Sequence, residues 1–458
     1  MANRSAAVSD VNLERSRPPG PRGLPFLGNI ADFGRDQLGF VQRCRTDHGE
    51  IVSANFAGWP TLLVTDMDAI ESILVKNHHS FTKNSLVWRQ TRALFGDGLL
   101  TSEGELWQRQ RRLAAPAFAG KQLAGYAPAI VAAADNTVGH WTDGDCFDMH
   151  PRMMGLSLRI AARTLFDSGV DDEIAIVDRA LNDLLREMES RIKRPVLLPD
   201  ALPLPGHIRY RRAIRDVEAL VQRMIAERRD TGAEGRTDFL SRLMAARDAE
   251  GNRMSDALLR DEAVTLLLAG HETTALVLSW AFYLLGQNMA AADRIAEEAE
   301  SVAPGRPLDA DDVDHLKWTE AVITETMRVF PPSWIIGRES IRPFEIGGYA
   351  FPAGVTIFIS QWVIHRDHRY YPRPEEFMPE RWLGDFRHSL PRFAYMPFGG
   401  GPRICIGQRF AIIEAVLILA TILRRFRIEW TGDRPIVPQP SITLRPRGGV
   451  HVRVTRRH

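Results

Sequence analysis

The chain has 458 residues, of which 45% are hydrophobic and 25% are charged, and its formal net charge is +1. This is the composition of a globular protein with enough chain to bury a large core. The near-zero net charge excludes a strong general attraction to nucleic acid or to an anionic membrane.

The cysteines and the apolar segments indicate the compartment. Cys44, Cys146 and Cys405 are odd in number and far apart, so a disulfide framework is not expected and a reducing compartment fits. The first residues contain no apolar segment typical of a secretory signal. The longest apolar run, Val264–Leu285, carries Glu272 near its middle and is expected to be a buried core helix. We therefore predict a soluble, cytoplasmic protein without a membrane span.

In chain order, the sequence predicts a disordered tail over residues 1–17 and a single domain over 18–458. The domain opens with the rigid, proline-rich lead-in RPPGPRGLPFLGN. Residues Glu50–Thr65 then alternate between apolar and polar side chains on either side of Gly58, which predicts a β-hairpin.

The remainder of the domain is expected to be mainly helical, with small β-sheets. Helical periodicity extends from about Gly104 to Glu300. Breaks in it are predicted at three places: near Gly144, near Pro195–Gly206 and near Gly232. A second hairpin is predicted over Phe344–Ser360, turning near Phe351–Gly354, and the segment 441–454 is again strand-like.

The segment Pro397–Gly407 places Cys405 in a glycine-rich loop directly before an apolar helical run. Glycines allow the backbone to come close to a flat ligand, and the start of a helix near Gly407 favours a thiolate. Such a thiolate is a nucleophile or a metal ligand, whereas a lone cysteine is otherwise a buried structural residue. No base lies in the loop and no second Cys/His cluster accompanies it. The pattern therefore favours a haem, which supplies four nitrogens itself and needs one axial ligand.

The stretch FGGGPRICIG resembles the signature of the cytochrome P-450 superfamily of haem-thiolate monooxygenases, in its soluble bacterial type. The matching positions are Phe398, Gly399, Gly401, Arg403, Cys405 and Gly407. The resemblance spans almost the whole chain and implies the cytochrome P-450 fold, with Cys405 as the axial ligand of haem b (iron protoporphyrin IX). It implies the reaction RH + O₂ + two electrons + two protons → ROH + water.

The resemblance also assigns roles to charged and aromatic residues. Guanidinium groups suit carboxylates, and the implied partners of the haem propionates are Trp107, Arg111, Arg338 and Arg403. The implied buried ion network, with a structural role, is formed by Glu325, Arg328 and Arg381.

The stretch LLLAGHETTALVL contains residues that disfavour a helix interior. Thr273 lies four residues after Ala269, so its hydroxyl can bond that carbonyl and open a groove in the helix. Taken alone, the stretch is equally compatible with a core helix that has a polar kink. The resemblance gives Thr273 a role in oxygen activation, makes Glu272 the acid that relays protons, and places Ala269 and Gly270 on the distal haem face.

A lipophilic substrate is expected, since the implied pocket is largely apolar. Its expected lining residues are Trp88, Leu99, Ala269, Thr273, Trp334, Ile335 and Ile442. The proline-rich connection Arg194–Gly206 is either a mobile lid over the entrance or a packed loop. Fatty acids, terpenoids, steroids and polyketides all remain compatible with this sequence.

Electrons are expected to come from NAD(P)H through a reductase and a ferredoxin or flavodoxin, because the sequence shows no flavin-binding domain. Basic residues near the haem motifs either form a docking patch for this acidic partner or are solvated charges: Arg109, Arg112, Lys121 and Arg409. A monomer is expected. Two alternatives remain open, a non-redox isomerase or dehydratase on the same scaffold and a haem-based sensor.

Overall fold

The computed structural model describes residues 17–166, 179–180, 182–184, 186–187, 190, 202–231 and 238–457. Residues 1–16 of the predicted tail and residues 194–201 of the proline-rich connection lie outside this part of the chain. The predictions of a disordered tail, of a lid and of a single domain over 18–458 therefore stay predictions.

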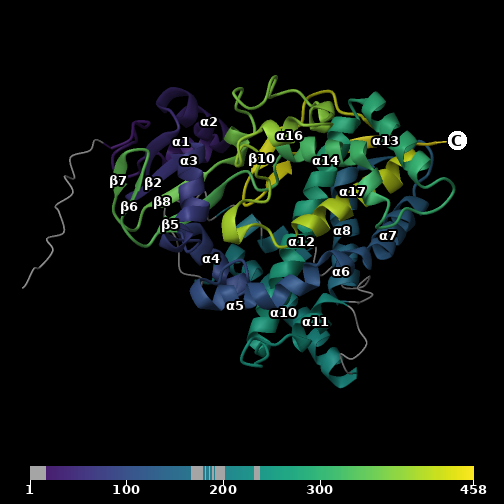
Figure 1. The fold of residues 1–458 in the computed structure, drawn as a ribbon, viewed down its shortest axis with the longest axis horizontal. Coiled ribbons are helices and arrows are strands. Elements are labelled where there is room, and N and C mark those ends of the chain that lie inside the picture. Colours follow the sequence, from purple (N-terminus) through teal and green to yellow (C-terminus); the bar gives the residue numbers. More distant parts are fainter. Residues whose placement is uncertain are drawn as a thin grey trace, which may run out of the picture.

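Helices form most of the described chain and surround one long central helix, α12 (Figure 1). The helices are α1 (Ile30–Arg35), α2 (Gln37–His48), α3 (Met67–Glu71), α4 (Leu86–Phe95), α5 (Gly104–Ala114), α6 (Gly120–Ala124), α7 (Ala127–Gly139), α8 (Met149–Phe166), α10 (Pro205–Thr231), α11 (Phe239–Ala245), α12 (Asp256–Leu285), α13 (Met289–Val302), α14 (Lys317–Val329), α15 (Gln361–Ile364), α16 (Phe386–Ser389) and α17 (Gln408–Arg425). Where residues between 104 and 300 are described, the predicted helical region is confirmed, and its break near Gly144 is followed by the short strand β4 (Cys146–Asp148).

The strands form small sheets, and the largest lies near the N-terminal helices α1 to α3 (Figure 1). Its order is β1 (Ile51–Phe56), β2 (Trp59–Val64), β8 (Thr356–Ile359), β5 (Ile336–Ser340) and β3 (Phe81–Thr82). A second sheet has the order β4, β12 (His451–Arg456) and β9 (Phe426–Trp430), and a two-stranded sheet joins β10 (Pro438–Pro440) to β11 (Leu444–Pro446). The predicted first hairpin is confirmed, because Phe56 pairs with Trp59 across the turn at Gly58.

The second predicted hairpin turns earlier than expected. Strand β6 (Phe344–Ile346) pairs with β7 (Tyr349–Phe351), so the turn lies at Gly347 and Gly348. Both glycines have positive φ, at 56° and 79°, which other residues rarely adopt. The following strand β8 leaves this hairpin and pairs with β2 and β5. The strand-like segment near the C-terminus likewise divides between two sheets, as β11 and β12.

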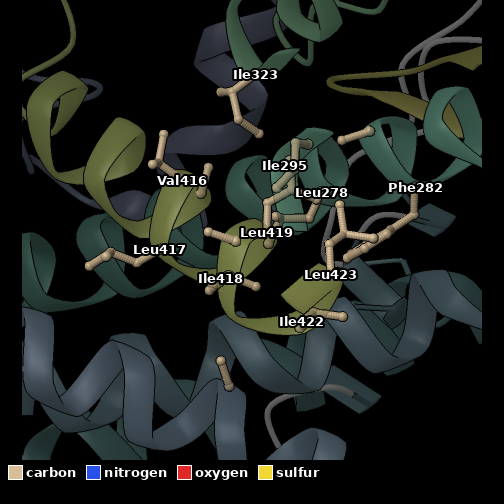
Figure 2. Close-up of a cluster of buried hydrophobic side chains, with 14 of the residues drawn as sticks. Leu278, Phe282, Ile295, Ile323, Val416, Leu417, Ile418, Leu419, Ile422 and Leu423 are labelled. Carbon is tan, nitrogen blue, oxygen red and sulfur yellow. The ribbon is translucent and has the colours of Figure 1, made fainter. Parts of the chain in front are cut away.

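Helix α12 is the core of the fold. The Ser255 hydroxyl caps it by accepting a hydrogen bond from the Leu258 N–H, and from Leu259 to Leu285 most of its side chains are buried. It packs against α8, α10, α14 and α17. Its length and hydropathy would suffice to cross a membrane, but 83% of its most apolar window is buried inside the protein. The prediction of a core helix is therefore confirmed. Figure 2 shows the apolar cluster that α12 shares with α13 and α17.

The predicted ion network lies at the C-terminal end of α14. Glu325 and Arg328 are both fully buried and form two hydrogen bonds of 2.8 and 2.9 Å. The Glu325 carboxylate also accepts hydrogen bonds from Arg381 Nε at 3.1 Å and Trp382 Nε1 at 2.7 Å. Arg328 donates further to the carbonyls of His365, Pro374 and Glu376. These contacts fasten the segment 365–382 to α14.

Replacing Glu325 by Gln should destabilise the protein strongly, because Arg328 would become a buried charge without a counter-ion. The expected loss in free energy of unfolding is roughly 3–5 kcal/mol. Urea denaturation of the purified protein measures it. The control is Glu376→Gln, whose side chain pairs with Arg373 at the surface and should change stability by less than about 0.5 kcal/mol. Equal stability of the two variants would contradict the assigned role.

Candidate active site

The loop before α17 is shaped by contacts that only glycine permits. Gly399 and Gly401 have φ angles of 75° and 68°. A Cβ atom on Gly401 would lie 1.8 Å from the carbonyl oxygen of Leu74, so this glycine presses the loop against the helical turn Ser72–Lys76. A hydrogen bond from the Cys405 N–H to the Phe398 carbonyl, at 3.0 Å, closes the loop. The loop thereby fixes the position of the sulfur just before α17.

The protonation of Cys405 corrects one expectation. The Gly407 N–H acts to lower the pKa of this thiol, as predicted, and the cations Arg111 and Lys83 act in the same direction. Burial outweighs them and leaves the pKa above its ordinary value. The protein therefore favours the thiol until a metal coordinates it, since a coordinated thiol loses its proton. This arrangement suits a metal ligand better than a free nucleophile.

Helix α12 leaves one turn open on the side of the predicted oxygen groove. Ala269 is exposed although the helix around it is buried, and a Cβ on Gly270 would meet no atom within 4 Å. The Thr273 hydroxyl donates to the Ala269 carbonyl at 2.8 Å, as predicted. Ile406, next to Cys405, packs against the same apolar cluster as Leu268 of α12. The opened turn and the cysteine loop thus border the same apolar cluster.

Two cations that form no recorded ion pair within the described residues border this site, although Glu103 lies near both. Arg338 is buried, and its one recorded hydrogen bond to the described residues goes to the Gly337 carbonyl at 2.8 Å. Burial and Arg403 lower the pKa of Arg338 to about 10. Burial, Arg338 and Arg403 lower the pKa of Lys83 to about 7. Buried cations need anionic partners, so this cluster fits the two carboxylates of a haem.

Arg403 and Trp107 are arranged differently from the prediction. The Arg403 guanidinium lies over the Trp107 ring at 4.2 Å, donates to the Ser102 carbonyl at 2.7 Å and pairs with Glu103. It therefore already has an anionic partner, unlike Arg338. Lys83 was missed by sequence reasoning, because no periodicity or motif marks a lone lysine before α4. Arg111 is half-buried and close enough to Cys405 for their charges to interact.

Two acidic residues beside the opened turn have protein partners. The Glu272 carboxylate accepts hydrogen bonds from Thr443 and Arg445 of the C-terminal hairpin. Glu414 of α17 is fully enclosed and accepts a hydrogen bond from the Thr274 hydroxyl at 3.3 Å. Burial raises the pKa of Glu414 to about 8, so it is a neutral acid at neutral pH. The sequence analysis did not identify Glu414, since nothing in an apolar helical run indicates which element it will face.

The predicted pocket residues divide into two groups. Leu99 and Ile442 pack with the cluster that contains Leu268, and Trp88 lies beneath Lys83 with 5.6 Å between the ammonium and the ring centre. Trp334 is 2% exposed and lies in a different core cluster, together with Ile335. Its indole N–H donates to the Ser441 carbonyl at 2.9 Å. This placement makes Trp334 a core residue and does not support its predicted role in the pocket.

The outer face of the cysteine loop borders a surface cavity of about 560 Å³. Its charged lining residues are Arg387, Arg392, Arg409 and Glu320. Of the predicted docking residues, Arg112 and Arg409 are exposed, whereas Arg109 is held by Asp248 at 2.7 Å. The side chain of Lys121 lies outside the described residues.

A cysteine at the start of a helix, an opened helical turn and a ring of cations together define a haem-thiolate protein. Residues 18–452 match the family model Cytochrome P450, and the chain belongs to this family. Membership implies a haem, the use of O₂ and electrons supplied by a reductase.

Similar proteins come from Streptomyces and from a cyanobacterium. The chain is 36% identical to cyclooctat-9-en-7-ol 5-monooxygenase of Streptomyces melanosporofaciens, over 93% of this chain and 90% of that protein. It is 33% identical to pentalenene oxygenase of Streptomyces avermitilis, over 95% and 97%. The cyanobacterial CYP120A1 structure with bound retinoic acid superposes with a TM-score of 0.85 at 25% identity, covering 96% of this chain and 99% of that chain. The chain is thus a bacterial-type P450 monooxygenase that acts on lipophilic small molecules, as predicted.

Lys83 should limit the pH dependence of haem uptake. Bound propionates would favour the charged ammonium, whereas without them the pKa of Lys83 is about 7. Above this pKa, uptake includes proton binding by Lys83, which offsets the proton that Cys405 loses when it coordinates the metal. Haem affinity should therefore rise with pH up to about 7 and change little above it. Titrating the haem-free protein with haem at about pH 6, about pH 7 and about pH 9 measures both ranges.

Lys83→Met should bind haem with an affinity that keeps rising above a pH of about 7, because only the proton loss of Cys405 would remain. The matched control is Lys76→Met, which removes a surface lysine paired with Glu71 and should behave like the parent protein. Once reduced and treated with carbon monoxide, Lys83→Met should still show the thiolate-type absorption, which Cys405→Ser should lose. A pH dependence unchanged in Lys83→Met would exclude Lys83 as a propionate partner.

Proposed function

We propose that this P450 hydroxylates or epoxidises a terpenoid hydrocarbon or alcohol. The observation that carries the proposal is the similarity, along more than 90% of the chain, to oxygenases named for pentalenene and for cyclooctat-9-en-7-ol. The apolar residues around the opened turn of α12, among them Leu99 and Ile442, support a substrate of this type. The names of these relatives also support an oxygenase over an isomerase, a dehydratase or a sensor.

The proposed site holds haem b with Cys405 as the axial ligand. Arg111, Arg338 and Lys83 would hold its propionates, while Arg403 and Trp107 would support that wall through their contacts with Ser102 and Glu103. When bound, the haem supplies the binding and reductive cleavage of O₂. Ala269 and Gly270 leave the space beside it, and the Thr273 oxygen, whose hydrogen is donated to the Ala269 carbonyl, can accept a hydrogen bond from water held in this groove.

Glu272 follows directly on this turn and is the proposed acid that exchanges protons with solvent. Two protons must reach the site for each oxygen atom that is inserted, because the second oxygen atom of O₂ leaves as water. NAD(P)H would supply the two electrons through a reductase and a ferredoxin or flavodoxin. Exposed Arg112 and Arg409 support docking of such an acidic partner beside the cysteine loop. A monomer in the cytoplasm completes the proposal.

Thr273→Ala should divert electrons from product to hydrogen peroxide, because the groove would lose the hydroxyl that orients water for proton delivery. Product and peroxide formed per NAD(P)H consumed are the measurement. Thr274→Val is the matched control, since the Thr274 hydroxyl bonds Gly270 O and Glu414 instead of Ala269. Thr274→Val should remain coupled. An unchanged product yield in Thr273→Ala would rule out the role given to this hydroxyl.

The substrate class is tested by titrating the oxidised protein with lipophilic compounds and recording the spectral change that reports loss of water from the iron. Cyclic terpene hydrocarbons and alcohols should produce this change at lower concentrations than fatty acids, steroids or polyketides. The best binder should then be converted to an oxygenated product that contains one atom from ¹⁸O₂. Tighter binding and conversion of a fatty acid would replace the proposed class.

A further inference from the structure

The Glu272 carboxylate is held asymmetrically. Its Oε1 atom accepts three hydrogen bonds, from Thr443 Oγ1 at 2.8 Å, Arg445 Nε at 3.0 Å and Arg445 Nη2 at 2.7 Å. Its Oε2 atom accepts no recorded hydrogen bond from the part of the chain that the structure describes. Glu272 is 7% exposed, so these three contacts determine where its carboxylate points.

The segment that carries both donors, Thr443 and strand β11, is itself rigidly attached. Leu444, between Thr443 and Arg445, donates its N–H to the Pro332 carbonyl at 3.0 Å. Its carbonyl accepts the indole N–H of Trp280, two turns beyond Glu272 on α12, also at 3.0 Å. Leu444 is fully buried, so the strand cannot shift without disturbing the core. The two donors are therefore presented to Glu272 from a fixed frame.

The same segment begins at the substrate side. Ile442 packs against the cluster formed by Leu99 and Leu268, and the next residue, Thr443, bonds Glu272. Ile442 and Thr443 lie in the bend directly before β11, so only Leu444 separates them from Arg445. A ligand that presses on Ile442 therefore acts on the segment that positions the carboxylate.

The charged groups around Glu272 identify Arg445 as its counter-ion. His150 lies close to both, but burial and then Arg445 lower its pKa to about 4, so it is neutral at neutral pH. Asp148, the other charged group near His150, accepts hydrogen bonds from the N–H groups of Val450 and His150. Thr443 contributes a neutral donor. The Arg445 guanidinium, with two donors on one oxygen, thus provides both the charge and the direction.

We infer that Arg445 is a positioning residue for proton delivery, which fixes Oε1 of Glu272 and leaves Oε2 to exchange a proton between solvent and the Thr273 groove. The inference rests on the proposed function of Glu272. It assigns the C-terminal hairpin, 173 residues away in sequence, a part in coupling electron use to product formation. Substrate contact at Ile442 would change the hydrogen bonds that Thr443 and Arg445 donate to Glu272. Proton delivery would then depend on whether the pocket is occupied.

The test compares Arg445→Leu with Arg445→Lys and with Arg447→Leu, which removes an exposed arginine from the same hairpin. Arg445→Leu should lower product per NAD(P)H about tenfold, less than the roughly 10²-fold or larger effect of losing an acid–base group, and should increase the solvent deuterium isotope effect. Arg445→Lys should restore part of the coupling, since it keeps the charge. Arg447→Leu should match the parent enzyme.

A second measurement does not depend on turnover. Without the Arg445 cation, the Glu272 carboxylate should be protonated more readily, and infrared spectra of resting Arg445→Leu should show an additional carboxylic acid band, beyond that of Glu414 in the parent protein. That additional band should be missing from the double variant Arg445→Leu/Glu272→Gln. If Arg445→Leu fails to bind haem, Thr443→Val and Arg445→Lys carry the comparison, and each should increase the isotope effect.

The outcomes distinguish the inferred role of Arg445 from the proposed role of Glu272. If Glu272→Gln lowers coupling but Arg445→Leu and Arg447→Leu behave alike and no additional acid band appears, the role of Arg445 is wrong and the proposed function stands. If Glu272→Gln itself leaves coupling and the isotope effect unchanged, the proposed role of Glu272 is wrong and the inference is overturned with it.

Discussion

Helix α12 is packed into the protein core along most of its length but has one turn that no other described element covers. The arrangement of the site depends on this interruption of the packing. Over most of its length the helix is packed by α8, α10, α14 and α17. At Ala269 and Gly270 the packing stops, and the side chains are too small to close the space. The Thr273 hydroxyl donates a hydrogen bond to the Ala269 carbonyl within this turn. A core helix thus becomes the wall of a reaction site without losing its attachment to the rest of the fold.

The opposite wall depends on a different constraint, the close approach of two backbones. Gly401 allows the cysteine loop to lie directly against Leu74, and the hydrogen bond from Cys405 to Phe398 closes it. Around this loop, positive charges exceed negative ones. Arg403 pairs with Glu103, whereas Arg338 and Lys83 have no comparable anion among the described residues. The site is therefore organised for a flat group that brings its own negative charge and its own metal.

The sequence was sufficient for the features that local patterns determine. The cysteine loop, the hydroxyl–carbonyl contact at Thr273 and the first hairpin were predictable, because short spacings or a long motif define them. The buried triad around Glu325 was expected only from the family resemblance, since Arg381 lies far from Glu325 in the sequence. The turn at Gly347 was misplaced because Gly354 offered an equally plausible turn nearby. Trp334 was expected in the pocket, but its indole N–H found the Ser441 carbonyl in the core.

Local sequence patterns could not predict contacts between segments that are far apart in the chain. Lys83 lies near Arg338 and Arg403 because the fold brings together strands and helices that are far apart in sequence. Glu272 forms its ion pair with Arg445 for the same reason. Glu414 is similar, since a single acid in an apolar helix does not reveal that it will bond Thr274. Charged groups of this kind follow from the completed fold, whereas the motif residues can be recognised before it.

The unmatched cations also bear on the life of the chain before it acquires its cofactor. A haem-free molecule must keep Lys83 and Arg338 close together in a poorly solvated place, which raises the free energy of its folded state. Binding of haem to the folded form removes this cost and shifts the folding equilibrium by mass action. In a cell, newly made chains would then be degraded by proteases when porphyrin is scarce and accumulate when it is plentiful. The supply of cofactor would set the amount of this enzyme as well as its activity.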